Sequence, residues 1–129
     1  MPTVQHATLT DPNNHEPKGI STASSDSLYV ANGSGSGTWK QRLRKLTATI
    51  SPALVAANTT TEQTFTVNNV ALATDYCIGV SKPTAQAGLG IVGWRVSADN
   101  TIGITFSNNT GAGITPTASQ TYTFFVWRD

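Results

Sequence analysis

The chain has 129 residues, a formal net charge of +1 and only 12% charged residues, about half the share usual in a soluble domain. This length indicates one domain with an appendage rather than two full domains. A neutral surface rich in Thr and Asn favours a β-rich protein that packs among copies of itself or other proteins. It disfavours nucleic-acid binding, because neutralising phosphates requires a broad basic face. We therefore expect no nucleic-acid partner.

Residues 1–38 have the composition of an extended arm. Pro2, Pro12 and Pro17 oppose helices and interior strands, and the Gly/Ser run at 33–37 predicts a flexible hinge. Between them, residues 26–33 predict a short strand that ends in an Asn-Gly turn. Because an isolated strand is not stable by itself, we expect it to pair with another chain or with the main domain.

From residue 39 onward, alternating apolar residues predict a β-domain without a helix. We expect six strands, around Leu46–Ile50, around Phe65 and Val67, and within 75–83, 90–98, 101–109 and 120–129. The pair Asp99-Asn100 predicts a hairpin turn. The predicted fold class is therefore all-β: a compact antiparallel β-sandwich or partly open barrel over residues 39–129, preceded by the extended N-terminal arm of residues 1–38.

The alternation also assigns side chains to faces. It places Tyr76, Ile78 and Val80 on one face of their strand, and Val92, Trp94 and Val96 on one face of theirs. Trp94 and Trp127 lie within strands, so we expect both to be packed, whereas Trp39 is expected to pin the base of the arm to the sandwich. The last strand is apolar on both faces. Its second face is therefore expected to be covered, by the domain's own second sheet or by a neighbouring subunit.

Residues suited to catalysis or metal binding are scarce. His6 and His15 both lie in the arm, and no pattern of metal ligands or Ser/His/Asp set is present on the predicted strands. The alternative of a hydrolase acting on envelope polymers depends on Glu62 and Asp75, the one candidate acid pair. We expect a non-enzymatic protein with no cofactor and no metal. The single cysteine, Cys77, excludes an intrachain disulfide and is expected to be a small buried hydrophobic residue.

Lys40, Arg42, Arg44 and Lys45 form a basic cluster, of which Lys40, Arg42 and Arg44 share one face of an extended strand. Two interpretations remain open. The cluster docks onto an acidic protein surface or nucleic acid, or it marks a solvated edge strand where basic side chains prevent unwanted pairing. A stripe of this size is too small for tight nonspecific DNA binding, which typically uses about six or more phosphate contacts.

Residues 9–39, LTDPNNHEPKGISTASSDSLYVANGSGSGTW, resemble an N-terminal module of tailed-bacteriophage virion proteins. The shared pattern is His-Glu-Pro-Lys-Gly, then small residues, a Tyr-Val strand and a Gly/Ser run before a tryptophan. The rest of the chain is similar to small β-domains of phage structural proteins. That similarity lies in the hairpin VSADNTIGITFSN, the following ITPTA and the final Tyr-containing strand.

The resemblance implies a non-enzymatic component of the virion, assembled in the host cytoplasm. A head decoration (cement) protein is the leading expectation; it would bind the outer capsid lattice through its arm and stabilise the particle. The implied partner is the major capsid protein or another virion protein. Carried over to this chain, the attachment motif is His15, Glu16, Pro17, Lys18 and Gly19.

Beyond the motif, we expect partner contacts from Tyr29, Trp39, Lys40, Arg42 and Arg44. The alternative within virions is a neck, tail or head-fibre component that attaches to the host surface, with exposed aromatics such as Tyr29 or Trp39 binding glycans. A homo-oligomer is expected, preferably a trimer, because the low charge and the two-faced last strand indicate a subunit interface. No signal peptide or apolar run of about 20 residues is visible, so no membrane partner is expected.

Overall fold

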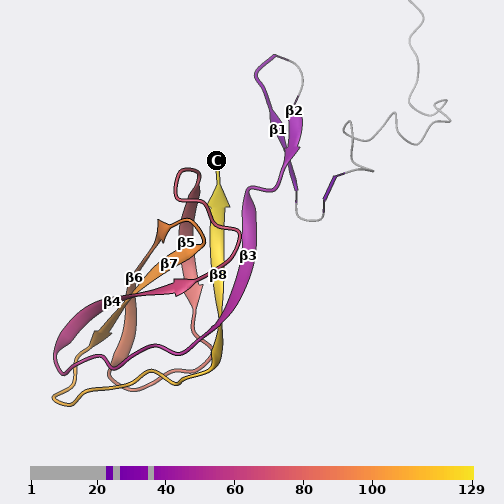
Figure 1. Cartoon of the computed structure of the whole chain (residues 1–129). Helices are drawn as coiled ribbons and strands as arrows, with labels where there is room; N and C mark the ends of the chain where they lie inside the picture. Colours follow the sequence, from indigo (N-terminus) through magenta and orange to yellow (C-terminus); the bar gives the residue numbers. More distant parts are fainter. Residues whose placement is uncertain (1–22, 25–26, 35–36) are drawn as a thin grey trace, which may run out of the picture. The chain divides into compact units, whose positions relative to one another are not determined.

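The computed structural model describes residues 23–24, 27–34 and 37–129, and the regular elements in them are all β-strands (Figure 1). The predicted all-β class is confirmed. Within these residues, no helix is long and apolar enough to cross a membrane. The chain divides into two units after Gln41, residues 1–41 and residues 42–129, and each is described by itself. The predicted attachment motif, His15 to Gly19, lies outside the described residues, as does His6.

The first unit contains a β-hairpin. Strand β1 (Leu28–Ala31) pairs antiparallel with β2 (Gly37–Lys40), and Ala31 stands opposite Gly37. The predicted short strand therefore exists, but its partner is the segment directly after the Gly/Ser run. The strands on both sides of the run belong to one hairpin, so the run lies within the first unit, which ends at Gln41.

The second unit consists of two three-stranded antiparallel sheets, with the orders β3-β8-β5 and β4-β7-β6 (Figure 1). The strands are β3 (Leu43–Ile50), β4 (Thr59–Thr66), β5 (Asp75–Ser81), β6 (Leu89–Ala98), β7 (Thr101–Asn108) and β8 (Gln120–Arg128). These are the six strands that the alternation predicts, and the two sheets form the predicted β-sandwich.

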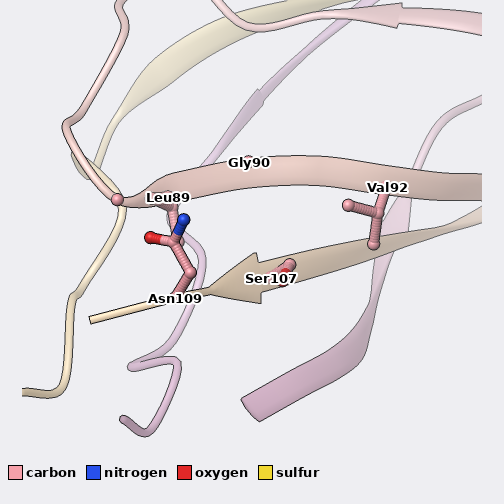
Figure 2. Close-up of a pocket in the computed structure, with 6 residues that line it drawn as sticks. Leu89, Gly90, Val92, Ser107 and Asn109 are labelled. Atoms are coloured by element: carbon pink, nitrogen blue, oxygen red, sulfur yellow. The ribbon is translucent and has the colours of Figure 1, made fainter. Parts of the chain in front are cut away.

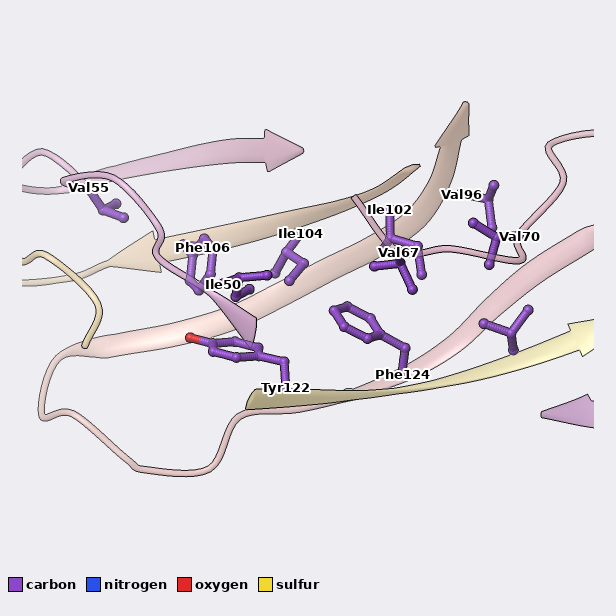
Figure 3. Packing of buried hydrophobic residues seen from close by; sticks show 11 residues of the cluster. Ile50, Val55, Val67, Val70, Val96, Ile102, Ile104, Phe106, Tyr122 and Phe124 are labelled. Atoms are coloured by element: carbon purple, nitrogen blue, oxygen red, sulfur yellow. The ribbon is translucent and has the colours of Figure 1, made fainter. Parts of the chain in front are cut away.

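The core lies between the central strands of the two sheets. Tyr122 and Phe124 of β8 point toward Ile102, Ile104 and Phe106 of β7 (Figure 3), and all five side chains are fully buried. The other buried apolar residues are Ile50, Val55, Val67, Val70, Val96 and Val126. Burying a side chain of this size stabilises the fold by about 1.5–3 kcal/mol. The core therefore depends on one face of each sheet and leaves both outer faces free of any role in it.

The hairpin between β6 and β7 has the predicted two-residue turn. Asn100 adopts a left-handed backbone conformation with φ 55°, which asparagine tolerates better than most residues. The side chains of this turn also fasten the loop between β4 and β5. The Asp99 carboxylate accepts the Leu72 N–H at 2.9 Å, and the Asn100 side-chain oxygen accepts the Asn69 N–H at 2.8 Å.

A β-bulge in β5 overturns the predicted face of that strand. Its pairing with β8 shifts between Cys77 and Gly79, so Ile78 is an extra residue and the alternation is reset. Tyr76 and Ile78 are 56% and 52% exposed, while Cys77 and Val80 pack against the core. The prediction that Tyr76, Ile78 and Val80 share a face is therefore wrong. Cys77, expected to be a buried small residue, is half-buried. Burial raises the pKa of its thiol.

Strand β6 has two similar irregularities, the second of them between Val96 and Ala98. Its pairing with β7 shifts between Ile91 and Gly93, which makes Val92 the extra residue and leaves it exposed. Trp94 stands opposite the buried Ile104, yet its side chain is 39% exposed. Trp94 is therefore packed only in part. The prediction that Val92, Trp94 and Val96 share a face is wrong, because Val92 is the extra residue.

Candidate functional site

Arg44, one of the predicted partner contacts, is buried inside the sandwich and is only 8% exposed. It stands opposite Val126 on the inner face of β3. Its guanidinium donates to the Asp75 carboxylate at 2.6 Å and to the Asn69 carbonyl at 2.5 Å. Arg44 therefore stabilises the fold and is not available to a partner, so this part of the prediction is wrong.

Asp75 is the centre of a buried charge cluster. Besides Arg44, its carboxylate accepts two hydrogen bonds from Arg128, at 2.7 and 2.8 Å, and one from the Ala71 N–H at 2.8 Å. Burial by itself would raise the pKa of Asp75. The hydrogen bonds from Arg128 and Ala71, together with the charges of both arginines, outweigh it and lower the pKa to about 2. Asp75 is therefore ionised, and its ion pairs hold the start of β5 against Arg44 on β3 and Arg128 on β8.

The remaining basic residues of the predicted stripe are in different surroundings. Arg42 lies over the Trp127 ring, 5.7 Å from its centroid, and its guanidinium is 3.6 Å from the Asp129 carboxylate. Lys45 is exposed on β3, an edge strand of its sheet, as the second interpretation of the cluster proposed. Lys40 is exposed on β2, in the other unit. The four basic residues therefore do not act as one stripe.

The outer face of the β3-β8-β5 sheet carries large apolar side chains. The pairing registers place Leu43, Trp127 and Tyr76 in one row across the three strands, and Phe125 in the next row. Leu43 and Phe125 are 45% and 38% exposed. With the outward Ile78 of the bulge, these residues are called the apolar face: Leu43, Tyr76, Ile78, Phe125 and Trp127.

The apolar face bears on the prediction that both faces of the last strand are covered. The second sheet of the sandwich covers the inner face of β8, where Tyr122, Phe124 and Val126 are buried. It cannot cover the outer face, where Phe125 stands between Lys45 on β3 and Gly79 on β5. The outer face of β8 is therefore not covered by the sandwich itself.

The outer face of the β4-β7-β6 sheet is polar instead. By register it presents Thr60, Glu62, Thr64 and Thr66 of β4, Thr101, Gly103, Thr105 and Ser107 of β7, and Gly93 and Arg95 of β6. The Arg95 guanidinium donates to both Glu62 oxygens, at 2.7 and 2.9 Å. These hydrogen bonds are the main reason that the pKa of Glu62 is lowered. The Glu62 side chain crosses Gly103, where an added Cβ would lie 2.9 Å from its carboxyl carbon.

The predicted acid pair for a hydrolase, Glu62 and Asp75, is not assembled as such a pair. Each carboxylate is bound by arginines of its own, and the pKa of each is lowered. A general acid at neutral pH requires a raised pKa. Within residues 23–24, 27–34 and 37–129, no three His, Cys, Asp or Glu side chains gather as metal ligands.

Two shallow hollows of about 300 Å³ each are present on the sandwich. The first lies on the polar face (Figure 2) and is lined by Gly88, Leu89, Gly90, Val92, Ser107 and Asn109. The second lies near the ends of β5 and β6 and is lined by Val80, Lys82, Thr84, Ala85, Gln86, Leu89 and Ile91. In the second, the Lys82 ammonium donates to the Thr84 carbonyl. Among the described lining residues there is neither an acidic side chain nor a histidine.

The hairpin of the first unit brings three predicted contact residues together: Tyr29, Trp39 and Lys40. Tyr29 is exposed and stands opposite Trp39, with the ring centroids 5.3 Å apart in an edge-on arrangement. Gly37 makes this possible, since an added Cβ would lie 2.5 Å from the Val30 carbonyl oxygen and 2.8 Å from the Tyr29 ring. Trp39 thus organises its own hairpin.

Comparison of the chain with models of known protein families, with curated proteins and with solved structures finds no match.

Proposed function

We propose that this chain is a structural component of a tailed-bacteriophage virion, specifically a head decoration protein. In this proposal the N-terminal unit binds the major capsid protein and the sandwich projects or assembles on the lattice. The observation that carries the proposal is the division of the chain after Gln41. It separates the segment that resembles phage attachment modules from a compact β-sandwich.

The charges of the sandwich support a structural role. Asp75 and Glu62 are held by arginines in ion pairs, and Asp99 and Asn100 fasten a loop. These four polar side chains therefore stabilise the fold. What the sandwich offers to other molecules is surface, apolar on one side and rich in threonine on the other.

The mechanism of attachment is additive. Each copy gains contact area and backbone hydrogen bonds where its N-terminal unit meets the lattice. Many copies on one particle then strengthen the shell collectively, because neighbouring capsid subunits are stapled at many points. The exposed Tyr29 and Lys40 of the hairpin are further contact residues in this scheme.

The test uses virions that lack the protein and the full chain added back, with binding measured by co-sedimentation. The double variant Glu16→Ala/Lys18→Ala is expected to lose most of its binding, because the motif anchors the chain. Lys82→Ala is the matched control: it removes a charge from the sandwich and is expected to bind like the unchanged protein. Equal binding by both variants would show that the motif is not the anchor.

The exposure of Tyr29 beside Trp39 favours one second candidate: a neck, tail or head-fibre component whose hairpin binds host surface glycans. Exposed aromatic rings stack on the apolar faces of sugars. In that case Tyr29→Ala reduces adsorption of the phage to host cells and leaves particle stability unchanged. For a decoration protein the same variant leaves adsorption unchanged.

A further inference from the structure

The apolar face of the β3-β8-β5 sheet consists of five large apolar side chains that the core of the sandwich does not use. We propose that it packs against the same face of a second copy of the chain, forming a two-fold symmetric dimer. This inference does not depend on the virion assignment, since it rests on the sandwich alone. It also replaces the trimer expected from the sequence with a different symmetry.

The area of the face fits such a contact. Five large side chains that are each partly exposed present on the order of 400 Å² of apolar surface, within the range of the largest patches on monomers, which are often binding surfaces. A standard interface takes about 800 Å² from each partner, of which slightly more than half is apolar. The apolar face supplies that apolar part, and the next row along the sheet, Thr47, Thr123 and Ser81, supplies a polar border on one side.

The charges on the face permit contact between copies. Arg42 and Asp129 form a pair, which leaves Lys45 as the charge on this face without an acidic partner in the described ion pairs. The net charge of the whole chain is only +1, so long-range repulsion between copies is weak. A large net charge or an acidic rim would have favoured an unlike partner instead.

A two-fold axis parallel to β8 keeps the Lys45 side chains of the two copies apart. It places β3 of one copy over β5 of the other, so Leu43 faces the second copy's Tyr76, and Lys45 faces Gly79 and the edge of Phe125. Gly79 offers the lysine space, because it has no side chain. The two Lys45 residues are then offset sideways by about two strand spacings, roughly 10 Å, in addition to the distance between the two sheets. Their separation therefore exceeds the screening length of about 8 Å at physiological salt.

The contact is isologous, since the same residues meet their counterparts in the other copy. An isologous contact closes at two subunits and does not build a trimer by itself. The polar face of the β4-β7-β6 sheet stays outside the interface. Thr and Ser side chains hydrogen-bond readily to solvent, and the Glu62–Arg95 pair carries no net charge.

The experiment is sedimentation equilibrium of the full chain over a concentration series from about 1 µM to about 500 µM, the range in which weak to moderate interfaces are resolved. The unchanged chain is expected to approach twice its mass of 13.6 kDa. Ile78→Lys is expected to raise the dissociation constant at least tenfold, because it places a charge in the contact. Val92→Lys is the matched control, since it makes the same change at an exposed, bulged position on the other sheet.

Each result decides the proposal. A mass of 13.6 kDa at all concentrations overturns it, and shows that the face stays uncovered or is covered within one chain. A three-chain mass overturns the two-fold arrangement. Equal weakening by Ile78→Lys and Val92→Lys shows that the apolar face is not the contact. Phe125→Ser is a second variant of the face without added charge, and its thermal unfolding is compared with that of Ile78→Lys to confirm that both variants fold.

Discussion

The two sheets of the sandwich place their charges and their apolar residues in opposite ways. In the β3-β8-β5 sheet, an aspartate and two arginines are joined at the end of the core, while large apolar side chains point outward. In the β4-β7-β6 sheet, the ion pair lies on the outer surface among threonines. Both sheets share one core, so this difference is not required by packing. This difference is the basis for proposing a contact on the first sheet and not on the second.

The comparison also separates two ion pairs that look alike in sequence. Asp75 is buried and receives four strong hydrogen bonds, whereas Glu62 and Arg95 meet in water. Breaking a buried pair leaves uncompensated charge in a low dielectric, and breaking an exposed pair leaves two hydrated groups. The structure therefore predicts a large effect in one sheet and a small one in the other.

The largest effect is expected for Asp75→Asn. It removes the negative charge from between Arg44 and Arg128, and because Arg128 is partly exposed we expect the loss to fall at the lower end for buried pairs, about 3 kcal/mol. The measurement is urea unfolding followed by tryptophan fluorescence. Glu62→Gln is the matched control and should shift the midpoint only marginally. If both variants unfold at the same urea concentration, the contrast between the two sheets is wrong.

The pH dependence of stability sharpens the same contrast. The pKa of Asp75 is lowered from 3.8 to about 2 in the folded chain, so folding is favoured by its ionised form. That contribution, about 2 kcal/mol, is fully present above the unfolded pKa and is lost as the pH falls from about 4 to about 2. The melting temperature measured across this range should fall more steeply for the unchanged chain than for Asp75→Asn. Parallel curves would contradict the assignment.

A smaller effect is expected for Gly103→Ala in the second sheet. The new methyl group would lie 2.9 Å from the Glu62 carboxyl carbon and would push this side chain off Arg95. Gly90→Ala is the control, because a Cβ there meets nothing within 4 Å. We expect Gly103→Ala to be less stable than Gly90→Ala by about 1 kcal/mol, since the displaced side chain is flexible. Equal stabilities in thermal unfolding would show that Glu62 moves aside without cost.

Much of the fold is predictable from the sequence, because alternation and turn residues are local signals. The six strands and the Asp99-Asn100 turn follow from them. The two faces that were predicted wrongly each contain one extra residue, Ile78 and Val92. Both are β-branched residues directly before a glycine, and an isolated glycine within a strand is a signal for a bulge. Because apolar residues continue on both sides of each bulge, the apolar alternation does not reveal where the side chains change face.

The candidate site was less predictable than the fold. Arg44 has the same local pattern as its basic neighbours. Its burial is possible because Asp75, 31 residues further along the chain, neutralises its charge. No local signal identifies such a partner. The Gly/Ser composition predicts a hinge, but it carries no signal for the hairpin in which the flanking residues pair. The apolar outer face was foreseen in part, since the last strand is apolar on both sides.

The most direct test of the proposed function is the number of copies per virion, measured by quantitative mass spectrometry against the major capsid protein. A decoration protein that covers the lattice predicts a ratio near one copy for each major capsid subunit. A ratio of a few copies per hundred would contradict the decoration role and place the chain at a vertex, neck or tail. Complete absence from purified particles would contradict the virion assignment itself.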